Sequence, residues 1–136
     1  MGPRVFRNLP EICIRLCPGR RALVVSDPKT LKIAGQRAEE MLKDAGFVAA
    51  HVTITEADMK TVERIRPIAR ENDFLLGVGG GRSIDVAKVA SFLEGKPFIS
   101  VPTAASHDGI ASSRASLRGT GAPTSIETHS PIAIVA

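Results

Sequence analysis

Short apolar runs separated by longer amphipathic stretches recur along this chain. Four such runs, at residues 22–25, 49–52, 74–78 and 98–101, are each short enough for one β-strand and are bounded by turn-forming residues. Between them, apolar side chains recur at the three- and four-residue spacing of an amphipathic helix. The pattern therefore predicts strands that alternate with helices.

Three helices are predicted in the intervening segments. The first covers residues 33–45 and stops at Gly46, the second covers residues 57–71 with a kink expected at Pro67, and the third covers residues 84–93. Strands and helices that alternate at this spacing indicate right-handed βαβ crossovers. We therefore expect an α/β fold with a Rossmann-like, doubly wound parallel sheet whose strands are buried on both faces.

The pattern changes after residue 102. Residues 112–117 and 124–128 flank a glycine-rich turn at residues 119–121, which predicts a β-hairpin. A further apolar strand is predicted at residues 132–135, and the chain stops one residue later without a cap or a following helix. We therefore expect one domain over residues 1–136 that is cut in the middle of a larger architecture.

Composition narrows the functional classes. The 136 residues, 43% of them apolar and 24% charged, are typical of one globular domain rather than a disordered chain. No apolar run approaches the roughly 18 residues of a membrane-spanning helix, and the first residues lack an apolar leader, so we expect no membrane insertion and a cytoplasmic location. The net charge of +4 comes from scattered basic residues without Trp or Tyr, which argues against nucleic-acid binding and suits a phosphorylated small molecule.

The residues that most often bind metals form no metal-ligand pattern here. Cys13 and Cys17 have no His or further Cys nearby, and we expect two thiols on one helical turn. His51 and His129 show no ligand spacing with Asp, Glu or Cys, and we expect them to be structural. No metal site is therefore predicted within this sequence.

Chemistry is concentrated first in residues 77–85, which read GVGGGRSID. This run follows a predicted strand directly and opens a predicted helix. Without Cβ atoms the backbone can approach a pyrophosphate closely, while the free amides and the positive dipole end of the helix face its charge. Arg82 can add a phosphate contact. A plain tight turn is the alternative, but three adjacent glycines lower stability without need in such a turn, so phosphate binding is favoured.

A second candidate group, at residues 102–109, follows the next predicted strand. Ligands gather at the carboxyl ends of strands in open α/β sheets, so we expect this loop and the glycine loop to meet at one crevice. Thr103 and Ser106 offer hydroxyls, and Asp108 offers a carboxylate that can accept hydrogen bonds from a polyol. Helix capping is the alternative role for these side chains. His107 is more typical of a surface or packing residue than of a general acid.

Asp27 ends the first predicted strand and can bind the hydroxyls of an adenine ribose. A turn aspartate before Pro28 is an equally good interpretation. The acidic residue of the usual dinucleotide fingerprint follows the second strand rather than the first, so both interpretations stay open.

The two motifs at residues 79–88 and 102–112, together with residues 125–131, closely resemble archaeal-type glycerol-1-phosphate dehydrogenases. These belong to the glycerol dehydrogenase and dehydroquinate synthase superfamily. The resemblance implies reduction of dihydroxyacetone phosphate to sn-glycerol-1-phosphate with NADH or NADPH, for archaeal membrane lipids. The resemblance covers only the cofactor-binding part of a family whose members are more than twice as long. It also implies that the full-length protein forms a homo-oligomer.

Residue roles follow from the resemblance position by position. Asp108 matches the position that touches the substrate, and no catalytic residue is assigned. Zinc in the family is held by one Asp and two His of a C-terminal helical domain, which we expect to lie beyond Ala136. Asp27 stands where many members lack an acid, which favours NAD. The positions that match the family's cofactor-binding motifs are Gly79, Gly80, Gly81, Arg82, Ser83, Ile84, Asp85, Thr103, Ala104, Ala105, Ser106 and Ser112.

Two other functions stay open from the sequence. A polyol dehydrogenase such as glycerol dehydrogenase would share the superfamily motif at residues 79–88 but act on an unphosphorylated substrate. A domain of this size could also bind a dinucleotide without catalysing a reaction. Phosphate dependence separates the first from the main hypothesis, and turnover separates the second.

Overall fold

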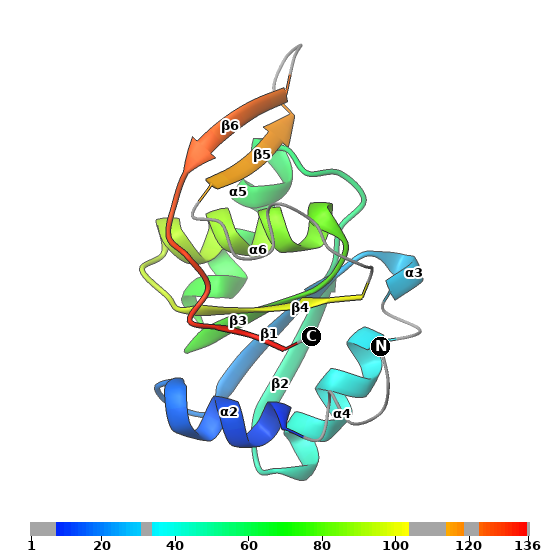
Figure 1. Ribbon diagram of the computed structural model, residues 1–136, viewed down its shortest axis with the longest axis vertical. Helices are drawn as coiled ribbons and strands as arrows, with labels where there is room; N and C mark the ends of the chain where they lie inside the picture. The colour runs from blue at the N-terminus through cyan, green and yellow to red at the C-terminus, as the bar shows by residue number, and fades with distance from the viewer. Residues whose placement is uncertain (1–7, 31–33, 104–113, 119–122, 136) are drawn as a thin grey trace.

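A five-stranded parallel sheet forms the centre of the molecule. The computed structural model describes residues 8–30, 34–103, 114–118 and 123–135. The strands lie in the order β2-β1-β3-β4-β7, and every pairing between neighbours is parallel (Figure 1). The order confirms the Rossmann-like sheet expected from the sequence. The strands are β1 (Arg21–Ser26), β2 (Val48–Thr53), β3 (Phe74–Gly79), β4 (Phe98–Pro102) and β7 (Ala133–Ile134).

Helices cover both faces of this sheet. The two helices α2 and α4 lie on one face and α5 and α6 on the other, while the short α3 follows β1 (Figure 1). Each predicted helix is present, although α6 begins three residues earlier than its apolar pattern suggested. The helices are α2 (Leu9–Leu16), α3 (Pro28–Thr30), α4 (Gln36–Asp44), α5 (Met59–Arg70) and α6 (Gly81–Leu93).

The core consists of two apolar clusters, one on each side of the sheet. Successive side chains of a strand point to opposite faces, so Val24 packs toward α2 and α4 whereas Leu23 and Val25 pack toward α5 and α6. Strands β1, β3 and β4 are buried on both faces, as predicted. The same expectation is wrong for β2, since Val48 is 56% exposed and only Ala49 of this strand is buried. Strand β2 lies at the edge, a position that apolar composition alone does not reveal.

The helix ends have local causes. Helix α4 is followed by Gly46 at φ +94°, a left-handed conformation that glycine adopts without strain. Helix α5 begins where the Asp58 carboxylate accepts a hydrogen bond from the Thr61 amide at 2.8 Å, which satisfies one of the free N–H groups of the first turn. The same helix continues through Pro67 to Arg70 as one element.

The predicted hairpin is present beyond α6, on the side away from the sheet (Figure 1). Its strands β5 (Arg114–Arg118) and β6 (Pro123–Glu127) pair antiparallel and form a separate two-stranded sheet. The side chains of Ala115 and Leu117 are buried in the cluster that contains α5 and α6. Helix α6 is therefore enclosed between the large sheet and the hairpin.

His129 fixes the segment that returns from the hairpin to β7. Its ring stacks on Phe98 at 5.6 Å between centroids and meets the edge of Phe92 at the same distance. Ser91 donates its hydroxyl hydrogen to the Lys88 carbonyl, so the Ser91 oxygen accepts from Nε2–H of His129 at 3.0 Å. The ring therefore lies in a slot formed by α6 and β4.

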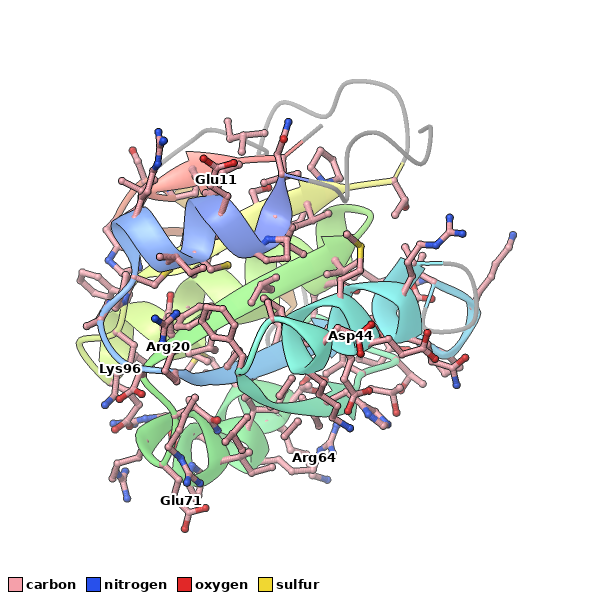
Figure 2. All side chains as sticks on the ribbon, turned by 90° about the horizontal axis from the view of Figure 1, so that it is seen from below. Glu11, Arg20, Asp44, Arg64, Glu71 and Lys96 are labelled. Carbon is pink, nitrogen blue, oxygen red and sulfur yellow. The ribbon has the colours of Figure 1, made fainter. Side chains whose placement is uncertain are left out.

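Charged side chains such as those of Glu11, Arg64 and Glu71 lie at the periphery of the molecule (Figure 2). At the surface between α5 and α6, Glu94 accepts hydrogen bonds from Arg66 at 2.7 Å and from Arg70 at 2.9 Å. These bonds lower the pKa of Glu94 to about 2. Among the described residues, no helix has the length and apolar character needed to cross a membrane.

Candidate functional site

The strand order brings two candidate groups of the sequence together. Strand β1 pairs with β2 on one side and with β3 on the other, so the chain changes direction across the sheet between β1 and β3. Crevices at such switch points, at the carboxyl ends of the strands, bind ligands in open α/β sheets. Asp27 follows β1 and the glycine turn follows β3. Their strands are neighbours although they are separated in the sequence.

Gly77 and Gly79 are each required at this turn for a different geometric reason. A Cβ on Gly77 would lie 3.0 Å from the Ile84 backbone, so its absence permits close packing of β3 against α6. Gly79 has φ +133°, and a Cβ there would lie 2.9 Å from Thr30 Oγ1. Only glycine fits this conformation and this space without strain. The turn is therefore held in one shape by its neighbours.

Gly80 leaves open space where the helix begins. Among the residues that the structure describes, a Cβ at Gly80 would meet no atom within 4 Å, and no side chain caps the N-terminus of α6. The first amides of an α-helix have no acceptor within the helix and carry the positive end of its dipole. The start of α6 can therefore take an anionic group against the backbone of Gly80 and Gly81.

Ser83, Ile84 and Asp85 of the motif are all buried, and each has a different role. The Ser83 hydroxyl is buried and makes no hydrogen bond with a described residue, which leaves a polar group available beneath the turn. Ile84 is 1% exposed in the core, and its amide donates to the Gly80 carbonyl at 3.2 Å. Its side chain thus supports the turn from below. Asp85, the next residue of α6, is also buried, and its charge raises the pKa of Lys88.

Lys88 was not singled out from the sequence. It is fully buried in α6, and this burial lowers the pKa of its ammonium group while Asp85 opposes that shift. Burial, and then the Lys88 charge, lower the pKa of His129. The signal in the sequence for a buried charge was a lysine within the apolar run of α6, because a helix that is covered on every side leaves a charged side chain without contact with water.

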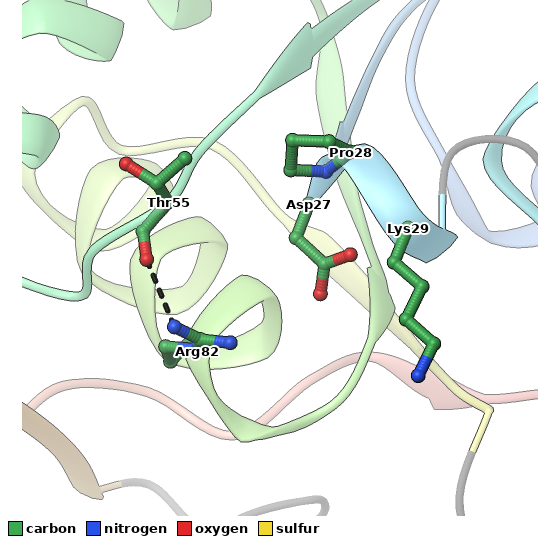
Figure 3. Close-up of a pocket in the computed structure, with 5 residues that line it drawn as sticks. All are labelled: Asp27, Pro28, Lys29, Thr55 and Arg82. Atoms are coloured by element: carbon green, nitrogen blue, oxygen red, sulfur yellow. Dashed lines mark hydrogen bonds between the residues drawn. The ribbon is translucent and has the colours of Figure 1, made fainter.

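A pocket of about 250 Å³ lies at the carboxyl ends of β1 and β2, beside the start of α6. Its lining residues are Asp27, Pro28, Lys29, Thr55 and Arg82 (Figure 3). Arg82 donates from one terminal nitrogen to the Thr55 carbonyl at 3.0 Å, which connects α6 to the segment after β2. The predicted residues Asp27 and Arg82 thus share one pocket, and Lys29 and Thr55 were missed by the sequence analysis.

Asp27 has the turn role that the sequence left open, and its place in the pocket is compatible with the other role. One carboxylate oxygen, Oδ1, accepts a hydrogen bond from the Thr30 amide at 2.7 Å. The Thr30 hydroxyl lies 3.2 Å from the Asp27 amide and 3.4 Å from the Val78 carbonyl, so Thr30 bridges the ends of β1 and β3. The spacing of Asp27 and Thr30, typical of a capped turn, was the signal for this bridge.

The second motif is described only at its start. The amide of Thr103 donates to the Gly79 carbonyl at 3.1 Å, so the segment after β4 begins beside the glycine turn. This contact confirms that the loops leaving β3 and β4 meet at their first residues. The other predicted residues of this motif lie outside the described part of the chain; these are Ala104, Ala105, Ser106, His107, Asp108 and Ser112.

Within the described residues, no three His, Cys, Asp or Glu side chains gather as a metal centre requires. Cys13 is buried in α2 and Cys17 is half-buried directly after it, and both thiols are free. A hydrogen bond between the two side chains raises the pKa of Cys13 and lowers that of Cys17.

Comparison with known proteins adds relatives of established name. Over 99% of this chain, 48% of residues are identical to the glycerol-1-phosphate dehydrogenase [NAD(P)+] of Methanothermobacter thermautotrophicus. The enzyme of the same name from Thermococcus sibiricus is also 48% identical, over the whole chain. The chain spans about 39% of the length of each. These relatives confirm the resemblance on which the sequence analysis relied.

Solved structures confirm the fold. An iron-containing alcohol dehydrogenase from Thermococcus thioreducens matches with a TM-score of 0.81 and 21% identity, over 98% of this chain and 43% of that one. Glycerol dehydrogenase from Schizosaccharomyces pombe matches with a TM-score of 0.77 and 21% identity, over 93% of this chain and 34% of that one. The family model described as iron-containing alcohol dehydrogenase matches residues 1–136. The chain therefore belongs to the iron-containing alcohol dehydrogenase family.

Proposed function

We propose that this chain is the coenzyme-binding part of a glycerol-1-phosphate dehydrogenase, which reduces dihydroxyacetone phosphate to sn-glycerol-1-phosphate with NADH or NADPH. The observation that carries the proposal is the uncapped start of α6 behind the glycine turn, at the switch point of the sheet. The names and the 48% identity of two curated relatives supply the substrate and the coenzyme class.

The residues present fit a dinucleotide. Within the described part of the chain, the space at Gly80 is open and the amides of Gly81, Arg82 and Ser83 have no acceptor, which suits the pyrophosphate. The Ser83 hydroxyl has no hydrogen-bond partner among the same residues and offers one further donor. Asp27, at the end of the neighbouring strand, suits the hydroxyls of the adenosine ribose. When bound, the reduced nicotinamide supplies a hydride for the substrate carbonyl. The role of this chain is to fix the position of the coenzyme, because orientation lowers the barrier to transfer.

The second motif completes the proposed site. Thr103, which already lies beside Gly79, would add a contact to the coenzyme, together with Ala104, Ala105, Ser106 and Ser112. Asp108 would bind the substrate. Asp85 would contact the coenzyme. Ile84 would only support the turn, since the Ile84 side chain is in the core.

Zinc does not fit the described part of this chain, which offers no group of ligands for it. We therefore derive no step through a metal. The prediction that a zinc ion is held by residues beyond Ala136 stays a prediction, as do a cytoplasmic location and assembly as a homo-oligomer.

Two alternative functions, a polyol dehydrogenase and a domain that binds the coenzyme without catalysis, are each compatible with a different observation. The motif at residues 79–88, which polyol dehydrogenases of the superfamily share, is compatible with an unphosphorylated polyol as substrate. The open start of α6 behind the glycine turn is by itself compatible with a domain that binds the coenzyme without turnover. The first predicts oxidation of glycerol without phosphate, and the second predicts coenzyme binding with no reduction of either substrate.

Calorimetric titration of the protein with NADH and NADPH tests the proposal, beside an assay of dihydroxyacetone phosphate reduction with and without added zinc. Binding together with phosphate-dependent reduction supports the whole proposal. Binding without turnover supports a coenzyme-binding part only. Absence of binding for both coenzymes contradicts the interpretation of the glycine turn.

A further inference from the structure

Asp85 and Lys88 place two opposite charges inside helix α6. Asp85 is 6% exposed and Lys88 is fully buried, and residues three positions apart share one face of a helix. Helix α6 lies between the large sheet and the hairpin, so both charges have little contact with solvent (Figure 1). Asp85 belongs to the proposed coenzyme site, whereas Lys88 has no role in the site as described so far.

The two charges stabilise each other. Burial lowers the pKa of the Lys88 ammonium group, and the Asp85 carboxylate opposes this shift. An interaction between two charges is mutual, so the ammonium group favours the ionised form of the carboxylate in return. Removal of one member of a buried pair of charges leaves the other uncompensated, which costs more than removal of both.

A carboxylate at this position needs a compensating charge if an anion is to bind nearby. The start of α6 is the proposed place of the pyrophosphate, and Asp85 lies about one helical turn beyond Gly81. An uncompensated anion there would repel the pyrophosphate and weaken the attraction of the helix dipole. With Lys88 present, the two buried charges sum to zero and the dipole of α6 still attracts an anion.

Lys88 is the only buried cation among the residues that the structure describes. Arg82 lies at the start of the same helix, but it is exposed and donates to the Thr55 carbonyl at 3.0 Å. Water and salt screen an exposed charge, whereas a buried charge acts more strongly on its neighbours. Lys88 is therefore the cation that acts most strongly on the Asp85 carboxylate.

We propose that Lys88 is a positioning residue for the coenzyme: its buried ammonium group keeps the Asp85 carboxylate ionised and in place to contact the coenzyme. The inference rests on the proposed function, since it presupposes that a dinucleotide occupies the start of α6 and that Asp85 contacts it. Lys88 itself contacts neither coenzyme nor substrate in this proposal. Its effect on binding therefore passes through Asp85.

A double-mutant cycle tests this dependence. The experiment measures the Kd of NADH and NADPH for the wild-type protein, and the Kd of NADH for Asp85→Asn, Lys88→Gln and the double variant. Each single variant should weaken NADH by about tenfold, the loss of one charge-assisted hydrogen bond, because each disturbs the same carboxylate. The double variant should bind NADH within about twofold of Asp85→Asn, because the Lys88 charge then has no Asp85 carboxylate to act on.

Ser91→Ala is the matched structural control. Ser91 is buried three residues after Lys88 in the same helix, and its hydroxyl donates to the Lys88 carbonyl at 2.9 Å and accepts from His129 at 3.0 Å. This variant should lower the free energy of unfolding, measured by urea denaturation, and leave the affinity for NADH unchanged. A loss of affinity as large as that of Lys88→Gln would show that any disturbance of α6 weakens binding, and would overturn the specific role of Lys88.

The outcomes separate the two levels of the argument. A wild-type protein that binds neither coenzyme contradicts the proposed function. If the wild type binds, the role of Lys88 is overturned when either single variant leaves the Kd of NADH unchanged, or when the losses of the two single variants add in the double variant.

The double variant keeps the test decisive if Lys88→Gln does not fold. It replaces a buried pair of charges by two neutral amides, which a protein interior tolerates better than one uncompensated charge. Its Kd is then compared with that of Asp85→Asn alone. Agreement within about twofold supports the proposal, and a larger further loss contradicts it.

Discussion

Gly79 and Gly80 are adjacent but are expected to respond differently to the same substitution. Gly79→Ala places a methyl group at φ +133° and 2.9 Å from Thr30 Oγ1, so it should lower the free energy of unfolding by about 1–3 kcal/mol. Gly80→Ala, at φ −91° in open space, should change it by less than about 1 kcal/mol. Urea denaturation of both variants measures the two values.

The same pair separates stability from binding. The methyl group of Gly80→Ala fills the space that we assign to the pyrophosphate, so this variant should keep its fold and lose affinity for NADH by at least about tenfold. A Gly80→Ala protein that binds NADH as the wild type does would refute the placement of the pyrophosphate there.

His129 should make stability depend on pH. Burial and the Lys88 charge lower the pKa of its ring below the ordinary 6.5, so the unfolded chain takes up a proton at a higher pH than the folded protein does. Stability is therefore complete above about pH 6.5 and is lost as the pH falls toward the folded pKa. Chemical denaturation at about pH 7.5 and 5.5 should show a smaller loss in His129→Gln than in the wild type. Equal losses would show that other groups carry the dependence.

At the scale of elements, helix α5 contains a removable defect. Pro67 lies inside the helix and is exposed, so it denies the Glu63 carbonyl its amide partner while contributing little to the core. Pro67→Ala should raise the free energy of unfolding by about 1–3 kcal/mol. Pro97→Ala is the control, because Pro97 lies outside any helix, where the loss of a rigid residue should leave stability unchanged or lower. A Pro67→Ala variant less stable than the wild type would contradict this account.

Most elements could be predicted because apolar spacing is a local property. Strands β1, β3 and β4 and the hairpin lie where the pattern placed them. The predicted start of α6 was three residues too late, because Gly81 to Ser83 carry no apolar pattern although they belong to the helix. The exposure of β2 depends on the order of strands in the sheet, and spacing along one segment contains no information about that order.

At the scale of the whole molecule, the candidate site could be predicted only in parts. The glycine turn was evident from its own residues. The proximity of Asp27 to it was not, because it arises from the pairing of β1 with β3, about 50 residues apart in the chain. Lys29 and Thr55 were missed for the same reason, since each becomes a pocket residue only when three chain segments meet. The family resemblance supplied the substrate, which no described contact specifies.

The outer edge of β7 is expected to promote self-association. Among the described strands, β7 pairs with β4 alone, and Ile132 and Ile134 are 41% and 42% exposed. Exposed apolar edge strands are sites of contact between chains. Ile134→Lys should therefore shift the protein toward monomer in size-exclusion chromatography, whereas Ile14→Lys, the same change at an exposed site on α2, should not. A wild-type protein that elutes only as monomer would contradict the prediction.

Helix α6 contacts β1, β3, β4, α5 and β5, and its residues Ser83 to Ser91 are all buried. Its amide hydrogens can exchange with solvent deuterium only when this packing is lost, so they should rank among the slowest of the molecule and report the free energy of global opening. The first three amides of the same helix have no acceptor among the residues that the structure describes and should exchange fast. A coenzyme seated on them would slow their exchange first. Deuterium exchange in one helix thus reports two separate properties: the first amides report occupancy of the site, and the buried amides report integrity of the fold.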